Sequence, residues 1–177
     1  MKQIKPETLA LSYLTTKTDI GRLHLVGTET HLWVLAFDDN WPKLKARLER
    51  EARRRAQVLR LSKDPNGLLG KTMNELTEFL KGKRRAFTIP CLPLGTDFEQ
   101  KAWDELRKIP YGNVSTYSNQ ARKLKRPQAI RAIAAANARN PISILIPCHR
   151  VLGKNGALTG YAGGIEVKEE LLALESL

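Results

Sequence analysis

The residues with the clearest chemical potential are Cys148 and His149, which are adjacent in the run IPCHRV. A cysteine is a good nucleophile only as the thiolate. Because its unperturbed pKa is about 8.5, a proton-accepting imidazole and nearby positive charge favour the reactive form. The pair lies in a stretch from Leu106 to Ile165 that contains ten Lys and Arg residues and no Asp or Glu. These features predict an activated thiol and a polyanionic substrate, although a bare Cys-His pair also arises by chance.

The composition is that of a globular protein with an unusual positive charge. The chain has 177 residues, 42% hydrophobic and 27% charged, which is enough for one domain of ordinary size or two small ones. A net charge of +12 and a pI near 10 favour nucleic acid or an anionic membrane as partner. No apolar run approaches the roughly 20 residues of a membrane span, and the first ten residues do not resemble a signal peptide. We expect a cytoplasmic protein.

The remaining cysteine and the other histidines show no catalytic pattern. Cys91 and Cys148 form neither a CxxC pair nor a His-Cys metal spacing, so we expect reduced thiols, no disulfide, no metal site and no cofactor. Cys91 lies in a proline-rich linker and is not expected to do chemistry. His24 and His31 fall within or beside expected strands and are interpreted as structural.

The segments that must position Cys148 are mostly helical. Thr96 is a plausible N-cap for a helix with acidic residues in its first turn and an apolar stripe that includes Trp103 and Leu106. A short helix is predicted from Ser115 or Thr116 to about Lys123, and an alanine-rich helix from Ala129 to Ala138. Two short helices around a tight turn, the second slim and basic, are a candidate helix-turn-helix. This signal is weak alone, because most helix hairpins bind no nucleic acid.

The N-terminal half predicts an α+β fold. Three apolar runs, at residues 9–14, 22–26 and 31–37, predict an antiparallel meander. A helix is expected from Lys43 to Arg60, with a basic face interpreted as solvated, and another from about Lys71 to Lys81. Prolines at 90 and 93 predict a boundary between an N-terminal domain of residues 1–90 and a C-terminal domain of residues 91–177. The fold class is thus a small N-terminal antiparallel β-sheet with flanking helices, then a mostly helical domain.

Several motifs together resemble one known family. They are Gly95-Thr96-Asp97-Phe98-Glu99-Gln100, Trp103, Ile109-Pro110-Tyr111-Gly112, Tyr117, Arg131-Ala132, Asn140-Pro141, Ile146 to Val151, Gly160-Tyr161-Ala162-Gly163-Gly164, Lys168 and Leu171-Leu172. This set resembles O6-alkylguanine-DNA alkyltransferase, also called methylated-DNA-protein-cysteine methyltransferase. The likeness is close from Gly95 to Glu175. The preceding residues match only in pattern, as the variable, ribonuclease H-like domain of that family.

The resemblance implies direct repair of duplex DNA that contains O6-alkylguanine; whether O4-alkylthymine is also a substrate stays open. A thiolate displaces guanine at the alkyl carbon, and the departing base must be protonated or hydrogen-bonded. Because a thioether has no easy hydrolytic exit, each molecule is expected to act once. A monomer is expected, with cooperative binding to DNA left open.

The resemblance also implies roles for individual residues. Cys148 is the acceptor, His149 takes its proton through a water, and Glu175 stabilises the imidazolium. Asn140 braces the turn before the site. Lys168 assists proton balance, with a plain surface lysine as the alternative.

The same resemblance places the recognition helix in the minor groove and the damaged base outside the stack. Arg131 fills the vacated place, and Tyr117 pushes the phosphate of the flipped nucleotide and protonates guanine N3. The expected DNA-contacting residues are Arg131, Tyr117, Ala132, Ala134, Ser115, Thr116, Lys125 and Arg126. The expected alkylguanine pocket comprises Tyr161, Ala162, Val151, Ser143 and Asn137, with backbone carbonyls of Cys148 and Val151 and the Ala162 amide directed at the base.

Some positions depart from the family pattern, and two other functions stay open. Lys125 and Ala134 stand where glycine is common, so a positive φ at Lys125 would be costly. Ser143 and Ala162 differ from common pocket residues, which leaves substrate breadth open. A non-catalytic damage sensor is disfavoured by the presence of Cys148. A basic helix-turn-helix regulator would leave the glycine-rich motif at residues 160–164 unexplained.

Overall fold

A four-stranded sheet forms the centre of the N-terminal half. The computed structural model describes residues 7–55, 57–63 and 66–176. The strands are β1 (Glu7–Thr18), β2 (Gly21–Gly27), β3 (Leu32–Phe37) and β4 (Gln57–Lys63), in the spatial order β3-β2-β1-β4. The pairs β1/β2 and β2/β3 are antiparallel, which confirms the predicted meander, whereas β4 runs parallel to β1.

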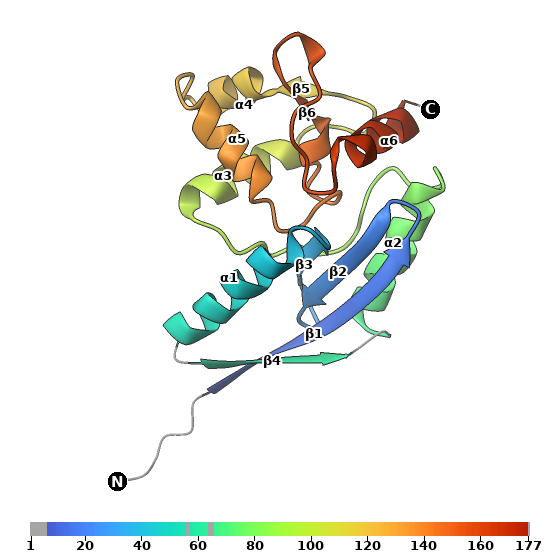
Figure 1. Ribbon diagram of the computed structural model, residues 1–177, viewed down its shortest axis with the longest axis vertical. Helices are drawn as coiled ribbons and strands as arrows, with labels where there is room; N and C mark the ends of the chain where they lie inside the picture. The colour runs from blue at the N-terminus through green and yellow to red at the C-terminus, as the bar shows by residue number, and fades with distance from the viewer. Residues whose placement is uncertain (1–6, 56, 64–65, 177) are drawn as a thin grey trace.

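Two helices cover opposite faces of this sheet (Figure 1). They are α1 (Trp41–Arg54) and α2 (Leu68–Leu80). Alternate residues of a strand point to opposite faces, so Val26 packs in the cluster with α1, whereas Leu25 packs in the cluster with α2. Because both faces are covered, every residue of β3 is buried.

The prediction that this helix continues to Arg60 is wrong after Arg54. The α1 helix ends at Arg54, and residues 57–63 form β4 along the edge of β1. Ala56, which stands at helical spacing from Ala52 in the sequence and so favours a longer helix, lies outside the described residues. Pairing with a strand some fifty positions earlier overrides the local pattern. The second predicted helix is confirmed, although it begins at Leu68, before the expected Lys71.

The C-terminal half is built from four α-helices, as the described residues show: α3 (Asp97–Arg107), α4 (Tyr117–Lys123), α5 (Ile130–Ala138) and α6 (Ile165–Glu175). Thr96 caps α3 in a reciprocal capping box with Glu99, and Thr116 caps α4, as predicted. Short elements connect these helices: β5 (Ser115–Thr116), the 3-10 turn η1 (Cys148–Arg150), β6 (Val151–Leu152) and the 3-10 turn η2 (Lys154–Gly156). None of the helices in the described part is long and apolar enough to cross a membrane.

The outer edge of β3 joins the two halves. Leu32 exchanges backbone hydrogen bonds with the segment at Pro90 and Leu92, and Leu35 does so with Pro141 and Ser143. The chain that leads to Cys148 therefore continues the hydrogen bonding of the sheet. An ion pair between Arg47 of α1 and Glu99 of α3, at 2.6 Å, adds a side-chain connection.

Candidate active site

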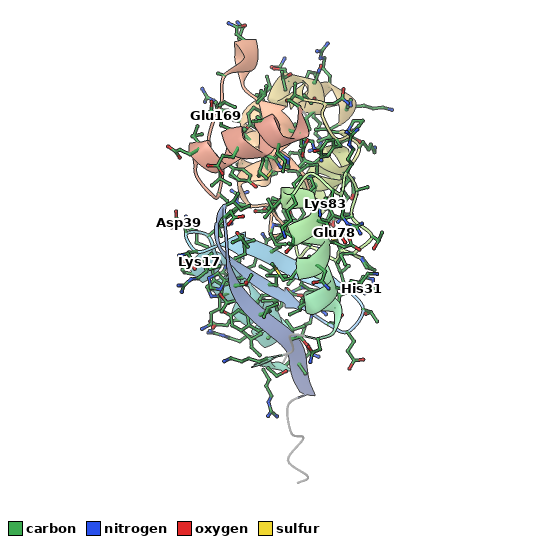
Figure 2. All side chains as sticks on the ribbon, turned by 90° about the vertical axis from the view of Figure 1, so that its right-hand side faces the viewer. Lys17, His31, Asp39, Glu78, Lys83 and Glu169 are labelled. Carbon is green, nitrogen blue, oxygen red and sulfur yellow. The ribbon has the colours of Figure 1, made fainter. Side chains whose placement is uncertain are left out.

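A cavity of about 650 Å³ has Cys148 in its wall. The predicted site residues that line it are Tyr117, Ala134, Asn137, Asn140, Ser143, Cys148, Tyr161 and Ala162. Sequence reasoning missed the contribution of Asp39, Asn40 and Lys43, which come from the N-terminal half. Figure 2 shows Asp39 beside the junction between the sheet and the C-terminal half. The cavity therefore lies where the two halves meet.

Asn140 fixes the turn that carries Cys148. Its Nδ2 donates to the carbonyl of Ile146 at 2.8 Å and to Cys148 Sγ at 3.3 Å, while its Oδ1 accepts from the amide of Ile142 at 3.0 Å. All three contacts are buried, so the loop is held by a fully used amide side chain. This geometry is that of the expected brace.

The hydrogen bond between His149 and Glu175 sets the histidine tautomer. Nε2 of His149 lies 2.8 Å from Oε1 of Glu175, and both side chains are buried. A carboxylate only accepts, so Nε2 carries the proton and Nδ1 holds a lone pair. Nδ1 is buried and has no hydrogen-bond partner among the described residues. It is the nitrogen available to accept a proton.

Arg150 is a component of the site that sequence reasoning did not assign. Its Nε and Nη2 donate to Glu175, and its Nη1 donates to the carbonyl of Ile109 at 2.7 Å. Burial alone would raise the pKa of Glu175, but hydrogen bonds from His149 and Arg150 hold that pKa at about 2. Glu175 therefore stays ionised and accepts from two neighbours in sequence. Only the adjacency of Arg150 to His149 could have suggested this.

Burial keeps both reactive groups neutral in the resting protein. It raises the pKa of the Cys148 thiol, against the opposing effects of the Asn140 amide and the Lys168 charge. Burial likewise lowers the pKa of His149, although Glu175 opposes this shift. In the resting protein, desolvation therefore outweighs the effect of the positive surroundings on the pKa of the thiol.

Two further predicted site residues, Tyr161 of the glycine-rich motif and Lys168 of α6, lie near the thiol. Lys168 is fully buried, so the surface-lysine alternative is wrong; its Nζ donates to the carbonyls of Val151 and Thr159. Burial lowers its pKa. Tyr161 lines the cavity, and its ring contacts the edge of Phe37.

Val151 lies beside the cavity and is not among the residues that line it. Its side chain is fully buried, and its carbonyl accepts from Lys168 at 2.8 Å. The predicted reading of guanine by this carbonyl would therefore have to use its second lone pair. The role of Val151 in the pocket stays a prediction.

The candidate helix-turn-helix consists of α4 and α5. Arg131 and Ala132 are exposed on α5, where they are free to meet a ligand. Lys125 adopts φ +56° in the turn, which is the costly conformation anticipated from the missing glycine. The guanidinium of Arg126 lies 5.7 Å from the ring centre of Phe98 on α3.

Buried polar contacts fix these helices relative to Cys148. Trp103 Nε1 donates to the carbonyl of Ala136 at 2.9 Å, which ties α3 to α5. Asn137 exchanges side-chain hydrogen bonds with Gln120 of α4. In addition, β5 pairs in parallel with β6, so that Ser115 lies opposite Val151. Tyr117, at the start of α4, is thereby brought to the same cavity as Cys148.

The sequence assigns no role in the reaction to His24, His31 or Cys91. His24 is buried, its ring stacks with those of Tyr13 and Trp41, and its Nε2 pairs with Asp38 at 2.5 Å. His31 is exposed. Burial raises the pKa of Cys91 to about 11, which keeps this thiol protonated. No group of three or more His, Cys, Asp or Glu side chains within the described ranges could hold a metal ion.

Comparisons with known proteins identify the family. Residues 97–177 match the family model described as 6-O-methylguanine DNA methyltransferase, DNA binding domain, and residues 11–93 match its ribonuclease-like domain. The inducible methylated-DNA-protein-cysteine methyltransferase of Bacillus subtilis is 50% identical over 101 residues, which are 57% of this chain and 56% of that protein. The chain thus aligns with little more than half the length of that relative.

Other relatives match over most of both chains. The methylated-DNA-protein-cysteine methyltransferase of Methanosarcina mazei is 38% identical over 86% of this chain and 95% of that protein. The crystal structure of Mycobacterium tuberculosis OGT in complex with DNA superposes with a TM-score of 0.80 at 34% identity, covering 93% of this chain and 92% of that one. The two family models together match most of the chain, and these relatives match over most of their length. The chain therefore belongs to the 6-O-methylguanine DNA methyltransferase family, that of the methylated-DNA-protein-cysteine methyltransferases.

Proposed function

We propose that this protein repairs duplex DNA by accepting on Cys148 the alkyl group of O6-alkylguanine. Its family is that of methyltransferases that transfer a methyl group from DNA to a cysteine of the protein itself. The observation that carries the assignment to Cys148 is its position in the wall of a cavity, braced by Asn140, next to the buried His149–Glu175 pair. Among the described residues, the other cysteine, Cys91, has no comparable His–Glu pair beside it, and its Sγ donates to the carbonyl of Ile89.

In the proposed reaction, the Cys148 proton passes through a water to Nδ1 of His149. The sulfur forms a bond to the alkyl carbon as the bond from that carbon to guanine O6 breaks. Tyr117 protonates N3 of the departing base. Glu175, ionised beside Nε2, stabilises the imidazolium that results. Because burial disfavours the separated charges, we infer that the thiol ionises only as the reaction proceeds.

We further propose that α5 enters the minor groove and that Arg131 replaces the flipped base in the stack. The exposure of Arg131 and the small side chain of Ala132 support this geometry, because a slim helix face approaches the DNA closely. Ser115, Thr116, Lys125 and Arg126 would add contacts around the turn. Sequence-independent contacts of this kind suit a protein that scans DNA for damage.

The product is a thioether, which water does not readily cleave, so each molecule would act once. We propose that it acts as a monomer in the cytoplasm. We also propose that residues 1–90 form a supporting domain and residues 91–177 the DNA-binding and transfer domain. Asp39 and Lys43 line the cavity that contains Cys148, which supports a role of the N-terminal half in shaping the site.

Transfer of a labelled methyl group from O6-methylguanine in a DNA duplex tests the proposal. We expect the label to saturate at one per protein molecule and to map to Cys148 by peptide mass spectrometry. A Cys148→Ala variant should bind the duplex without taking up label, whereas Cys91→Ser should react normally. Multiple turnovers, or label retained in Cys148→Ala, would overturn the proposal; binding without transfer in the unaltered protein would indicate a damage sensor instead.

A further inference from the structure

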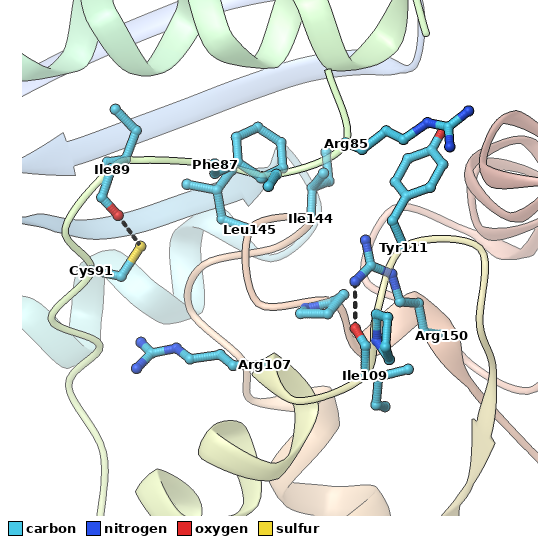
Figure 3. Close-up of a pocket in the computed structure, with 13 residues that line it drawn as sticks. Arg85, Phe87, Ile89, Cys91, Arg107, Ile109, Tyr111, Ile144, Leu145 and Arg150 are labelled. Carbon is cyan, nitrogen blue, oxygen red and sulfur yellow. Dashed lines mark hydrogen bonds between the residues drawn. The ribbon is translucent and has the colours of Figure 1, made fainter. Parts of the chain in front are cut away.

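A second cavity, of about 450 Å³, lies on the side of the Cys148 loop away from the active-site cavity. Thirteen residues line it, drawn in Figure 3. Three of them are arginines, Arg85, Arg107 and Arg150, and none is Asp or Glu. Its volume falls in the range of roughly 300–1,000 Å³ that is usual for small-molecule sites. Of its lining residues, only Arg150 also belongs to the site described above, through its contact with Glu175.

The positive charge of this cavity is only partly compensated. Glu175 neutralises Arg150. Arg107 has an exposed partner, Asp104, at 3.3 Å, and pairs of this kind are weak. Arg85 shows no carboxylate partner in the described ranges; its guanidinium lies 5.4 Å from the ring centre of Tyr111.

The charged groups occupy two ends of an apolar floor. Figure 3 shows Arg107 on the side of Cys91, and Arg85 and Arg150 on the side of Tyr111. The floor between these ends includes Phe87 and Ile144. Guanidinium groups bind phosphate oxygens through paired N–H donors, and an apolar floor accommodates a carbon skeleton. The arrangement suits a small organic molecule with an anionic group at each end.

Neighbouring residues of one segment line the two cavities. Ser143 lines the active-site cavity, while the next residues, Ile144 and Leu145, line the arginine cavity. Ile144 adopts φ +71°, which is strained for a β-branched side chain. Strain of this kind persists where the surroundings impose it and is concentrated at ligand sites and switch regions.

We propose that the cavity lined by Arg85, Arg107 and Arg150 is a binding site for a small organic bisphosphate, directly behind the loop that carries Cys148. Arg85, without a carboxylate partner in the described ranges, and Arg107, only weakly paired with Asp104, bind its two phosphates. Arg150 links the site to Glu175, and Ile144 links it to the wall of the active-site cavity.

Calorimetric titration of the full chain with fructose 1,6-bisphosphate, at constant ionic strength, tests this proposal. We expect one site per molecule and an affinity at least tenfold higher than for inorganic phosphate. Arg85→Gln and Arg107→Gln should each weaken binding at least fivefold. Arg53→Gln removes the same charge from an exposed position on α1 and serves as the matched control. Equal affinity for the two probes, equal effects of the three variants, or the absence of binding at millimolar concentration would overturn the proposal.

Two further measurements locate the ligand and identify its source. The amide resonances of Ile144 and Leu145 should shift on titration with the bisphosphate, and unchanged resonances would contradict the assigned location. An undamaged DNA duplex should leave the bisphosphate bound. If the duplex instead displaces the bisphosphate from the unaltered protein, and Arg85→Gln abolishes this competition, the cavity receives nucleic-acid phosphates rather than a small molecule. Thermal unfolding of each variant verifies that these exposed substitutions leave the fold intact.

Discussion

Nε2 of His149 lies 2.8 Å from a carboxylate oxygen of Glu175, the last residue of α6, and both side chains are buried. The same carboxylate accepts from the guanidinium of Arg150. The C-terminal helix thus supplies one anion that orients two consecutive residues of η1. Since Nε2 is committed to this contact, the opposite nitrogen of the imidazole is the only one left to take a proton.

Removal of this carboxylate should destabilise the whole protein. In a Glu175→Ala variant, Arg150 would remain buried without its anion and His149 without its acceptor. We expect the free energy of unfolding to fall by about 3–5 kcal/mol, as for other buried pairs that lose one partner. Urea denaturation measures this change. Glu51→Ala, which removes the partner of the exposed Arg54 and Arg55 at the C-terminal end of α1, should cost less than about 1 kcal/mol. Similar losses of unfolding free energy in both variants would show that the buried Glu175 stabilises the protein no more than an exposed ion pair does.

Acid should weaken the fold through the same pair. The pKa of His149 is lowered in the folded protein, so its contribution is complete above the ordinary value of 6.5 and declines as pH falls below it. The pKa of Glu175 is held at about 2 from an ordinary value of 4.5. Its contribution is therefore present above pH 4.5 and is lost between about pH 4.5 and 2.

Denaturation at a series of pH values provides the check. Between pH 4.5 and 2, the free energy of unfolding of Glu175→Gln should depend less steeply on pH than that of the unaltered protein. The difference should approach about 1.4 kcal/mol per pH unit, which corresponds to one proton. Parallel curves for the two proteins would refute the assigned titration.

Arg131→Ala should separate base flipping from chemistry. The exposed guanidinium on α5 does not line the cavity that contains Cys148. We expect labelled transfer from duplex DNA to slow by at least tenfold, because the vacated place in the stack is no longer filled. Reaction with free O6-alkylguanine should change less than twofold. Arg60→Ala, on the edge strand β4, is the control and should leave both rates unchanged. Equal losses with both substrates would count against the stack-filling role.

Lys125→Gly should stabilise the turn between α4 and α5. Glycine adopts φ near +56° without the steric cost that lysine incurs, although it also makes the unfolded chain more flexible. We expect a net gain of about 0.5–1 kcal/mol in the free energy of unfolding. Lys123→Gly, at the last residue of α4, should instead lose stability, by at most about 1 kcal/mol, because glycine is a poor helix former. A loss in both variants would mean that lysine makes compensating contacts in the turn.

Local signals in the sequence predict the elements around the site well. The Thr96 cap, the alanine-rich α5 and the strands of the meander each depend on residues close together in the chain. The predictions of this cap, this helix and these strands succeed because residue type and spacing carry the information directly. The motif IPCHRV and its downstream glycines likewise point to Cys148, His149 and Tyr161, whose individual roles stay predictions.

Other features depend on how distant segments dock. Strand β4 is stabilised by its partner β1, which local periodicity does not reveal. The ionic partner of Arg150 lies 25 positions away, and Lys43 of α1 lines the same cavity as Ala134 of α5, some ninety positions later. The raised pKa of Cys148 follows from burial, whereas the sequence shows only the surrounding positive charges. Sequence therefore identifies the reactive groups more readily than their protonation states.

The hydrogen bonds along the outer edge of β3 have a consequence for the isolated halves. Residues 90–92 and 141–143 occupy backbone groups that would otherwise face solvent at the end of the sheet. A fragment that ended before Pro90 would leave a fully apolar strand, LWVLAF, with free N–H and C=O groups. Such an edge recruits strands from other molecules. The loop that presents the acceptor thiol thus also protects the protein from self-association.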